Sequence, residues 1–254
     1  MTARPTVSLI VITRDEERLI GQCLKSAASF CNEMIVVDSL STDRTVEIAR
    51  ELGAHVFLQE FTDYVRQKQI ALDHATSQWV LLLDADEQAT YALGREIEEA
   101  ISAPDTADGY RIQRVLYHLG HYYTRPIYRD RPVRLFRRER GHIGGVDPHD
   151  KVIVDGRIDR LNSPILHFSY RDIADHVATI NRFSTRAAAE IEPSALSAIR
   201  MFTHPLWRFI NFYIVRGGFR DGGRGLYAAM TAAFYVFLKY AKVYERRLKT
   251  LHPR

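Results

Sequence analysis

Short apolar runs alternate with amphipathic stretches along the N-terminal part of the chain. The runs occupy residues 7–12, 34–37, 54–57 and 79–83. Between them, apolar side chains recur every three to four residues, as they do on the buried face of a helix. Strands that alternate with helices predict an α/β fold with a mainly parallel sheet. In such sheets, ligands bind at the carboxyl ends of the strands.

The pattern changes after residue 104. Residues 110–115 and 133–137 alternate in the manner of antiparallel strands. From residue 172 onward the sequence predicts helices, with breaks at residues 192–193 and 217–218. We therefore expect an α/β domain over residues 1–170, with halves 1–103 and 104–170. A C-terminal helical, amphipathic extension is expected over residues 171–254.

Length and cysteine content limit the class of protein. With 254 residues, the chain can form one large domain or two small ones. Cys23 and Cys31 do not suggest a disulfide framework, so we expect a reducing compartment. Residues 1–5 lack the apolar region of a signal peptide, so none is expected. The longest apolar run, residues 226–238, is shorter than the ~20 residues of a membrane-spanning helix.

Charge is unevenly distributed along the chain. Residues 199–254 hold 11 Lys/Arg against 2 Asp/Glu, whereas residues 1–198 hold 24 against 29. An acidic body with a basic tail results. Nucleic acid is not the expected partner, because the body is net negative and apolar side chains dominate the tail.

Polar residues follow three of the predicted strands. Residues 13–15 follow the first strand, Asp38 the second, and Asp84 and Asp86 the fourth, so all should converge on one crevice. Two carboxylates separated by one residue lean the same way on an extended chain and repel unless a cation lies between them. Mg²⁺ or Mn²⁺ carrying a diphosphate suits such oxygen ligands. Alternatively, the two acids only solvate a loop and cap a helix near Thr90.

Asp38 opens a turn rich in helix-capping side chains. Helix capping can account for the presence of Ser41 and Asp43 in this turn. It does not account for the acid at position 38. An acid in this position can accept a hydrogen bond from a ribose hydroxyl or a base N–H.

Five motifs, taken together, resemble a known family. They read SLIVITRDEE, MIVVDSLSTDRT, QKQIALDHATSQWVLLLDADE, RLFRR and GGVDPHD. In this order they are similar to the motifs of inverting glycosyltransferases of family 2, which have the GT-A fold, a Rossmann-like α/β fold. The subgroup they most resemble contains the small β-glucosyltransferases of the lipopolysaccharide inner core. The resemblance spans residues 7–167, and the tail is also similar to that subgroup.

The resemblance implies roles for individual residues. It implies that Thr13 and its neighbours line a uracil pocket, that Asp38 contacts the base and that Asp84 contacts the ribose. It further implies that Asp86 binds the Mg²⁺ or Mn²⁺ ion and that Lys68 lies near the nucleotide. Residues 1–103 would then form the nucleotide-binding half of the domain, and residues 104–170 the acceptor and catalytic half.

The loop after the first strand departs from the subgroup at one position. Asp15 stands where the subgroup commonly has Asn, and an added negative charge near a pyrophosphate is unhelpful. Asp15 and Arg14 are therefore secondary candidates, as neighbours of Thr13.

An inverting transfer also needs a general base and charge neutralisation on the leaving group. The subgroup has a His-Glu pair where this sequence has His149-Asp150, which makes Asp150 the preferred base. Asp147 is the alternative within the same GGVDPHD segment. Asp147-Pro148 is also a turn signal, so both acids could be surface charges.

Three other histidines have less specific interpretations. His118 and His121 are three residues apart, but Gly120 disfavours a helix and no third ligand accompanies them, so zinc is disfavoured against acceptor contact or a plain loop. His167 could complete the metal shell or be a hydrogen-bonded core histidine.

The expected activity is transfer of a sugar from UDP-glucose or a near relative to a lipid-linked bacterial glycan. A nucleotidyltransferase is a second candidate, although the loop after the first strand has no glycine and holds more acidic than basic residues, unlike a phosphate loop. A non-catalytic membrane-surface module is a third.

In the tail, residues at three- and four-residue steps share one apolar face with basic residues beside it, which suits an interfacial helix. The members of this face are Leu226, Met230, Phe234, Phe237, Ala241 and Tyr244. The basic residues near its end are Lys239, Lys242, Arg246, Arg247 and Lys249, and the interfacial aromatics expected from the preceding helix are Trp207, Phe209, Phe212 and Tyr213. We expect a cytoplasmic protein, peripheral on the inner face of the bacterial inner membrane, unless this face packs on the catalytic domain or on a second copy.

Overall fold

The computed structural model describes residues 5–125, 128, 130–146 and 149–251. The chain folds into two compact units. The first unit contains Met1–Tyr117, Tyr122–Thr124 and Tyr128–Ser169. The second unit contains His118–His121, Arg125–Ile127 and Tyr170–Arg254.

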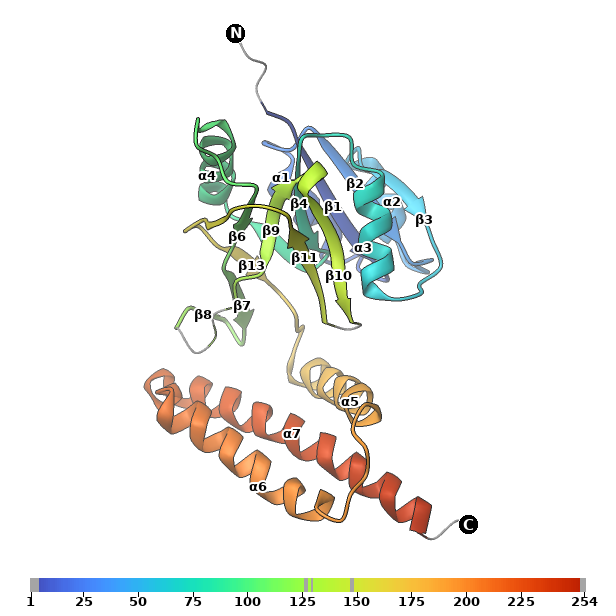
Figure 1. Ribbon diagram of the computed structural model, residues 1–254, viewed down its shortest axis with the longest axis vertical. Helices are drawn as coiled ribbons and strands as arrows, with labels where there is room; N and C mark the ends of the chain where they lie inside the picture. Colours follow the sequence, from blue (N-terminus) through green and yellow to red (C-terminus); the bar gives the residue numbers. More distant parts are fainter. Residues whose placement is uncertain (1–4, 126–127, 129, 147–148, 252–254) are drawn as a thin grey trace. The chain divides into compact units, whose positions relative to one another are not determined.

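A seven-stranded sheet forms the centre of the first unit, in the order β12-β6-β9-β4-β1-β2-β3 (Figure 1). Neighbouring strands β4, β1, β2 and β3 are parallel, whereas β9 runs antiparallel to both β4 and β6. The predicted α/β fold with a mixed, mainly parallel sheet is confirmed. The strands are β1 (Val7–Thr13), β2 (Glu33–Asp38), β3 (His55–Leu58), β4 (Trp79–Asp84), β6 (Gly109–Arg111), β9 (Val133–Arg137) and β12 (Ile158–Arg160).

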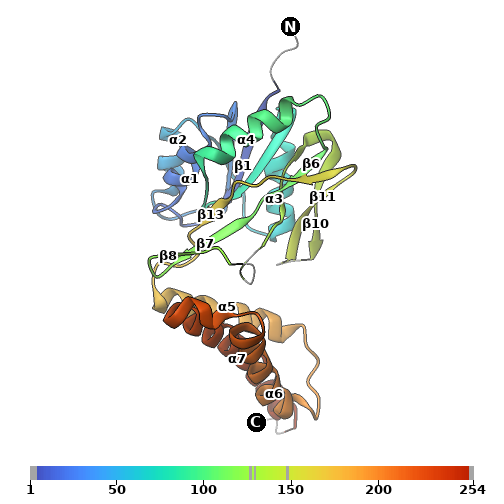
Figure 2. The same cartoon turned by 90° about the vertical axis from the view of Figure 1, so that its left-hand side faces the viewer.

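Helices cover both faces of this sheet. On one face, Leu81 and Leu83 of β4 pack in a core with α1 (Ile20–Ala27), α2 (Thr45–Glu51) and α4 (Tyr91–Ser102). On the other face, Val80 and Leu82 pack with α3 (Tyr64–Asp73) and with a separate hairpin, β10 (Gly141–Val146) and β11 (His149–Val154) (Figure 2). Alternate residues of β4 thus enter two cores, which is why the strand is apolar throughout.

The prediction of one strand over residues 110–115 is wrong. The chain forms β6 there and then β7 (Arg114–His118), which belongs to a second, four-stranded sheet in the order β5-β13-β7-β8. A register shift at Tyr110/Arg111 interrupts the pairing of β6 with β9, and such irregularities bend a strand. The other strands of this sheet are β5 (Glu87–Ala89), β13 (Ile165–His167) and β8 (His121–Tyr123).

The second unit is mainly helical, as predicted. It contains α5 (Ile173–Ala189), α6 (Ser197–Ile210) and α7 (Gly222–Leu251), and both α5 and α6 pack against α7. The predicted breaks at residues 192–193 and 217–218 both separate helices, and Gly217 adopts a φ of 75°. A π-helical turn, η3 (Asn211–Val215), and a 3₁₀ turn, η4 (Gly218–Asp221), join α6 to α7. None of the helices in the described ranges has the length and apolar character needed to span a bilayer.

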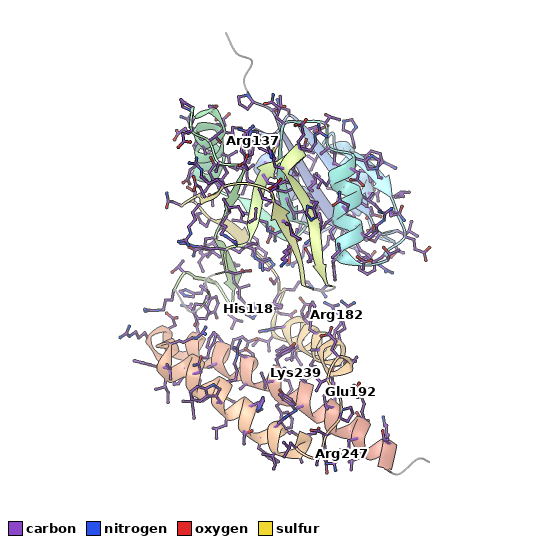
Figure 3. All side chains as sticks on the ribbon, viewed as in Figure 1. His118, Arg137, Arg182, Glu192, Lys239 and Arg247 are labelled. Atoms are coloured by element: carbon purple, nitrogen blue, oxygen red, sulfur yellow. The ribbon has the colours of Figure 1, made fainter. Side chains whose placement is uncertain are left out.

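Two basic side chains of α7 hold α5 in place. Lys242 Nζ donates to the carbonyl oxygen of Asn181 at 2.7 Å and to Ser184 Oγ at 2.8 Å. Arg246 donates to the carbonyl oxygen of Ala188 at 2.7 Å, at the end of α5 where helix carbonyls lack intrahelical partners. Lys239 and Arg247 lie on the same helix (Figure 3). Part of the basic charge of the tail is therefore used to join helices.

We predict that Gly225→Ala destabilises the second unit. A Cβ atom at Gly225 would lie 1.8 Å from the carbonyl oxygen of Gly218, so the close approach of α7 to η4 requires glycine. Overpacking of this kind costs about 1–3 kcal/mol, and thermal unfolding followed by circular dichroism should show a lower Tm. Gly223→Ala is the control, because a Cβ there meets nothing within 4 Å and alanine favours the helix. Equal Tm values for the two variants would contradict the prediction.

Candidate active site

Three of the predicted polar positions lie side by side at one edge of the main sheet. Thr13 is in register with Asp38 on the neighbouring strand, and Ile12 is in register with Asp84 on the other side. The parallel strands β2, β1 and β4 therefore present Asp38, Thr13 and Asp84 in order at their carboxyl ends. This is the edge at which α/β sheets bind ligands.

Asp84 lies within a cluster of opposite charges. Its carboxylate is 3.0 Å from Lys68 Nζ, 2.7 Å from Arg134 Nη2 and 3.6 Å from Arg114 Nη1. Burial alone would raise the pKa of Asp84, but the charges of Arg134 and Lys68 outweigh it and hold the pKa well below its usual value. Asp84 is therefore ionised, and its position is fixed from several sides.

Glu87 and two arginines belong to the same cluster, and none of the three was assigned a role from the sequence. Glu87 is completely buried and accepts from Arg134 at 2.8 Å and from Arg114 at 3.2 Å. Its second oxygen accepts from the Asp84 amide at 2.9 Å. Burial and the charge of Asp84 raise the pKa of Glu87, whereas the charges of Arg134 and Arg114 lower it. The net effect is a raised pKa. Glu87 lies in the motif LLLDADE and Arg134 in the motif RLFRR. These two motifs were the sequence features that could have identified both residues as part of the site.

Asp86 has a different partner. Its carboxylate lies 3.2 Å from His167 Nε2, because β13 pairs with β5 and places His167 opposite Glu87. Burial would lower the pKa of His167, but the hydrogen bond to Asp86 and its charge raise the pKa above the usual value. No group of three or more His, Cys, Asp or Glu side chains within the described ranges is arranged to hold a metal ion. Asp86 and His167 could supply two ligands, an oxygen and a nitrogen, and a bound diphosphate would supply others.

Asp150 meets the cluster from a separate element. It lies in β11, opposite Gly145 of β10, and accepts a hydrogen bond from Lys68 at 2.8 Å. Lys68 thus bridges Asp84 and Asp150, which are far apart in the sequence. Asp147 and the side chain of His149 lie outside the described residues.

The loops after β1 and β2 are joined by reciprocal hydrogen bonds. The Asp15 amide donates to Ser41 Oγ, and the Thr42 amide donates to Asp15 Oδ1, each at 2.8 Å. Asp15 has a φ of 53°, a conformation that Asn and Asp adopt more readily than most residues. Its side chain therefore has a structural role that Asn could also fill, and Arg14 beside it is exposed.

Thr13 and Asp38 are both buried but differ in their partners. Asp38 accepts hydrogen bonds from the Ser41 amide at 2.8 Å and from the Ser41 hydroxyl. These bonds within its own turn partly explain why an acid occupies position 38, which helix capping did not. Thr13 Oγ1 has no hydrogen-bond partner among the described residues. A buried polar atom of this kind calls for an explanation, such as a ligand.

His118 and His121 gain no support as a zinc site. His118 ends β7, and its Nε2 is 3.3 Å from the hydroxyl of Tyr227, which also lies 2.8 Å from His176 Nδ1. Burial lowers the pKa of His118, and burial together with His118 lowers the pKa of His176 to about 4. These rings form a neutral aromatic cluster within the second unit.

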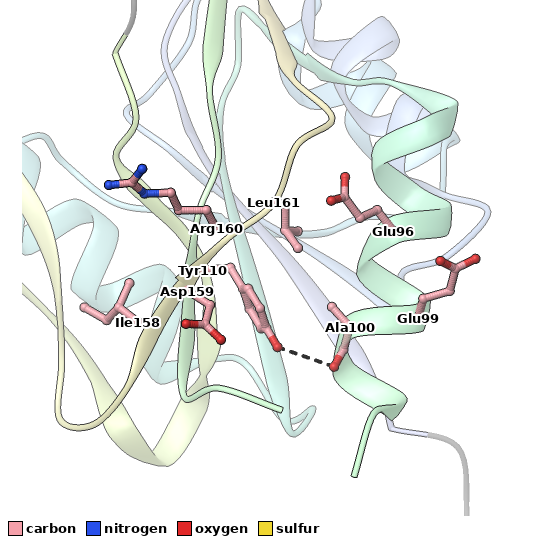
Figure 4. A pocket seen from close by; sticks show the side chains of 8 residues that line it. All are labelled: Glu96, Glu99, Ala100, Tyr110, Ile158, Asp159, Arg160 and Leu161. Atoms are coloured by element: carbon pink, nitrogen blue, oxygen red, sulfur yellow. Dashed lines mark hydrogen bonds between the residues drawn. The ribbon is translucent and has the colours of Figure 1, made fainter. Parts of the chain in front are cut away.

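A hollow of about 630 Å³ lies elsewhere on the first unit, between α4 and β12 (Figure 4). Its lining includes Glu96, Glu99 and Asp159, and Tyr110 donates from its hydroxyl to the carbonyl oxygen of Ala100 at 3.4 Å. Glu96 is already engaged by the amides of Asn162 and Ser163. Thr13, Asp38 and Asp84 do not line this hollow, so it is not the candidate site.

Comparison with known proteins assigns the chain to a family. The model of Glycosyl transferase family 2 matches residues 8–155. The lipopolysaccharide core biosynthesis glycosyltransferase LpsC of Rhizobium meliloti (strain 1021) is 31% identical, covering 100% of this chain and 97% of LpsC. The uncharacterized glycosyltransferase RT0209 of Rickettsia typhi is 30% identical, covering 96% of this chain and 88% of that protein. A crystal structure of S. aureus TarS 1-349 in complex with UDP-GlcNAc covers 98% of this chain and 93% of its own, with 14% identity and a TM-score of 0.48.

The assignment rests on the sequence comparisons. The family model covers more than half of the chain, and LpsC is similar along almost its whole length. The chain is a glycosyltransferase and belongs to glycosyl transferase family 2.

Proposed function

We propose that this glycosyltransferase inverts the anomeric centre as it transfers glucose, or a closely related sugar, from a UDP-sugar to a lipid-linked bacterial glycan such as lipopolysaccharide core. The observation that carries the proposal is the meeting of Asp84 and Asp150 at Lys68, at the carboxyl end of β4. Asp84 ends β4, at the edge where α/β sheets bind ligands, and Asp150 comes from the segment expected to supply the base. The similarity to LpsC, whose name refers to lipopolysaccharide core biosynthesis, supports the acceptor class.

In the proposed reaction, the Asp150 carboxylate takes the proton of an acceptor hydroxyl. The acceptor oxygen forms a bond to the anomeric carbon, and the bond from that carbon to the phosphate oxygen breaks on the opposite side. The electron pair leaves with UDP, and the configuration inverts in one step. Mg²⁺ or Mn²⁺, held by Asp86 with His167 as a second candidate ligand, would neutralise charge on the departing diphosphate.

The donor is placed by the strand-end residues. Thr13, whose buried hydroxyl oxygen lacks a partner in the described structure, is suited to contact the uracil. Asp38 would contact the base and Asp84 the ribose. Arg14 and Asp15 border this pocket, and the hydrogen bonds of Asp15 favour a supporting role for it.

The loop after β1 argues against the nucleotidyltransferase alternative. A phosphate loop presents free backbone amides to the ligand. Here the amides of Glu16 and Glu17 already donate to Thr45 Oγ1 at 2.7 Å and to Asp43 Oδ2 at 3.0 Å. Side chains of the neighbouring loop thus occupy the donors that a phosphate would need.

We further propose that the second unit binds the inner face of the bacterial inner membrane. Large apolar side chains of α6 are exposed, with Phe202 at 69% and Trp207 at 62%. Exposed apolar side chains continue on α7 at Leu226, Met230, Phe234 and Phe237. Several large exposed apolar side chains on neighbouring helices favour an interaction surface, and Arg216, Arg220 and Arg224 are exposed basic residues in and beside the turn between the helices. Anionic lipid suits both features.

The structure corrects part of the expected membrane surface. Lys242 and Arg246 are engaged by α5 and contribute less to lipid binding than the sequence suggested. Phe212, expected as an interfacial aromatic, is buried. The apolar rows of α6 and α7 therefore carry the proposal.

Asp86→Ala should abolish metal-dependent donor binding. Wild-type enzyme should gain thermal stability from UDP-glucose or another UDP-sugar with Mn²⁺, whereas the variant loses the side chain proposed to contact the ion. A panel of UDP-sugars and nucleoside triphosphates, with and without MnCl₂, measures this by Tm. Asp105→Ala is the control, because its side chain is 93% exposed and pairs only with surface Arg157 in the described structure. An unchanged Mn²⁺ response in Asp86→Ala would refute the metal assignment, and stabilisation by triphosphates alone would favour a nucleotidyltransferase.

Asp150→Asn should lower turnover by about 10²-fold or more while leaving donor affinity nearly unchanged, as expected for loss of a general base. Asp147→Asn should have a much smaller effect. The measurement is UDP release at saturating donor, with donor KM determined for each variant. The reverse ranking would move the base to Asp147, and normal turnover in both variants would exclude this segment from catalysis.

Replacing Phe202 and Leu206 together by Gln should weaken binding to anionic liposomes without unfolding the protein. Both side chains are exposed, at 69% and 61%, so the change removes apolar contact area and leaves the charge unaltered. Flotation with anionic and with neutral vesicles measures binding, and Tyr91→Gln on α4 is the control for an exposed aromatic outside this surface. Wild-type protein that floats with neither lipid would leave the second unit as a structural or self-association element.

A further inference from the structure

Lys68 occupies an unusual position for a lysine. Its side chain is only 6% exposed, on the face of α3 that packs towards the sheet. Its ammonium lies 3.0 Å from Asp84 Oδ1 and 2.8 Å from Asp150 Oδ2. Burial would lower the pKa of Lys68, but the charge of Asp84 and that of Asp150 raise it, so the lysine stays charged. A buried charge of this kind is stable only when its partners remain in place.

The element that carries Asp150 needs such a restraint. The β10–β11 hairpin forms its own two-stranded sheet and, among the described residues, shares no backbone ladder with the other two sheets. Gly144 and Gly145 lie in β10, and Gly145 faces Asp150 with a φ of 103°. Backbone hydrogen bonds of the main sheet therefore do not fix the position of Asp150.

Helix α3 supplies several of the contacts that hold this hairpin, and Val133 and Phe136 of β9 pack in the same core. The Ile143 amide of β10 donates to Gln69 Oε1 at 2.9 Å, and Ile143 and Val152 pack in one core with Ala71 and Leu72. Lys68, next to Gln69, adds the one ionic link from this helix to Asp150 that the described residues show. A single helix thus anchors the hairpin at its backbone, at its core and at its carboxylate.

We propose that Lys68 is a positioning residue that fixes the base Asp150 relative to the donor-contacting Asp84. The inference rests on the proposed function and extends it: Lys68 acts through Asp150, in addition to any contact with the nucleotide. A base displaced from the acceptor hydroxyl loses most of its effect, because proton transfer requires hydrogen-bond distance. Loss of Lys68 should therefore lower turnover more than it weakens donor binding.

The test is a double-mutant cycle with Lys68→Met and Asp150→Asn. The activity measured is UDP release with water as acceptor, using the UDP-sugar that wild-type enzyme hydrolyses fastest, with MnCl₂. Lys68→Met alone should lower kcat about tenfold or more and change donor KM by less than about threefold, in line with loss of an oriented base. In the Asp150→Asn background, the same substitution should have almost no further effect on kcat.

Two matched variants accompany the cycle. Arg66→Met removes a cation from an exposed position of the same helix and should leave kcat and KM unchanged. Lys68→Gln retains an N–H donor and is measured in parallel, because Lys68→Met leaves two carboxylates without their shared cation. Circular dichroism and Tm verify that each variant is folded.

The outcomes separate this inference from the proposed function. A raised donor KM with unchanged kcat, or equal losses of kcat in both Asp150 backgrounds, would overturn the positioning role and leave Lys68 as a nucleotide contact. Full activity of Asp150→Asn would overturn the base assignment itself, and the role of Lys68 with it. Activity lost in Asp150→Asn and not lowered further by Lys68→Met supports both.

Discussion

The site depends on the ion cluster at the end of β4. Glu87 and Arg134 are buried there, and a buried charge is tolerated only when opposite charges and hydrogen bonds replace the water it loses. Asp84 links the two halves of the cluster, because it meets Lys68 from α3 on one side and Arg134 from β9 on the other. Strands β4 and β9, helix α3 and the β10–β11 hairpin therefore have to assemble together for the whole cluster to be satisfied.

Local patterns were sufficient to predict the neighbouring parallel strands β1, β2, β3 and β4 and the polar residues at the carboxyl ends of three of them. Apolar periodicity identifies β1, β2, β3 and β4, and the polarity change at Thr13, Asp38 and Asp84 marks where they end. Short strands carry no such signal: β5, β12 and β13 have three residues each, too few for alternation to be visible. The error over residues 110–115 has the same origin, since a register shift divides one alternating run between two sheets.

The partners of the site residues were harder to predict than the residues themselves. Asp84 and Asp86 stand out because they come at the end of an apolar run, whereas Arg134 reaches Asp84 across 50 positions of sequence and His167 reaches Asp86 from β13, far along the chain. A single sequence shows which groups are charged but not which of them meet. The same limit applies to the tail, where the spacing of Lys242 and Arg246 indicated a basic surface but not their hydrogen bonds to α5.

The joined loops after β1 and β2 have a thermodynamic consequence. Five amides, those of Asp15, Glu16, Glu17, Thr42 and Arg44, are held by side chains of the opposite loop. Their conformational freedom is lost when the chain folds, so a molecule that settles beside them orders little additional backbone. Because these loops are already ordered before a ligand binds, binding on this side of the site loses little conformational entropy, which favours affinity. Association there should resemble docking to a preformed surface, with little loop reorganisation to slow it.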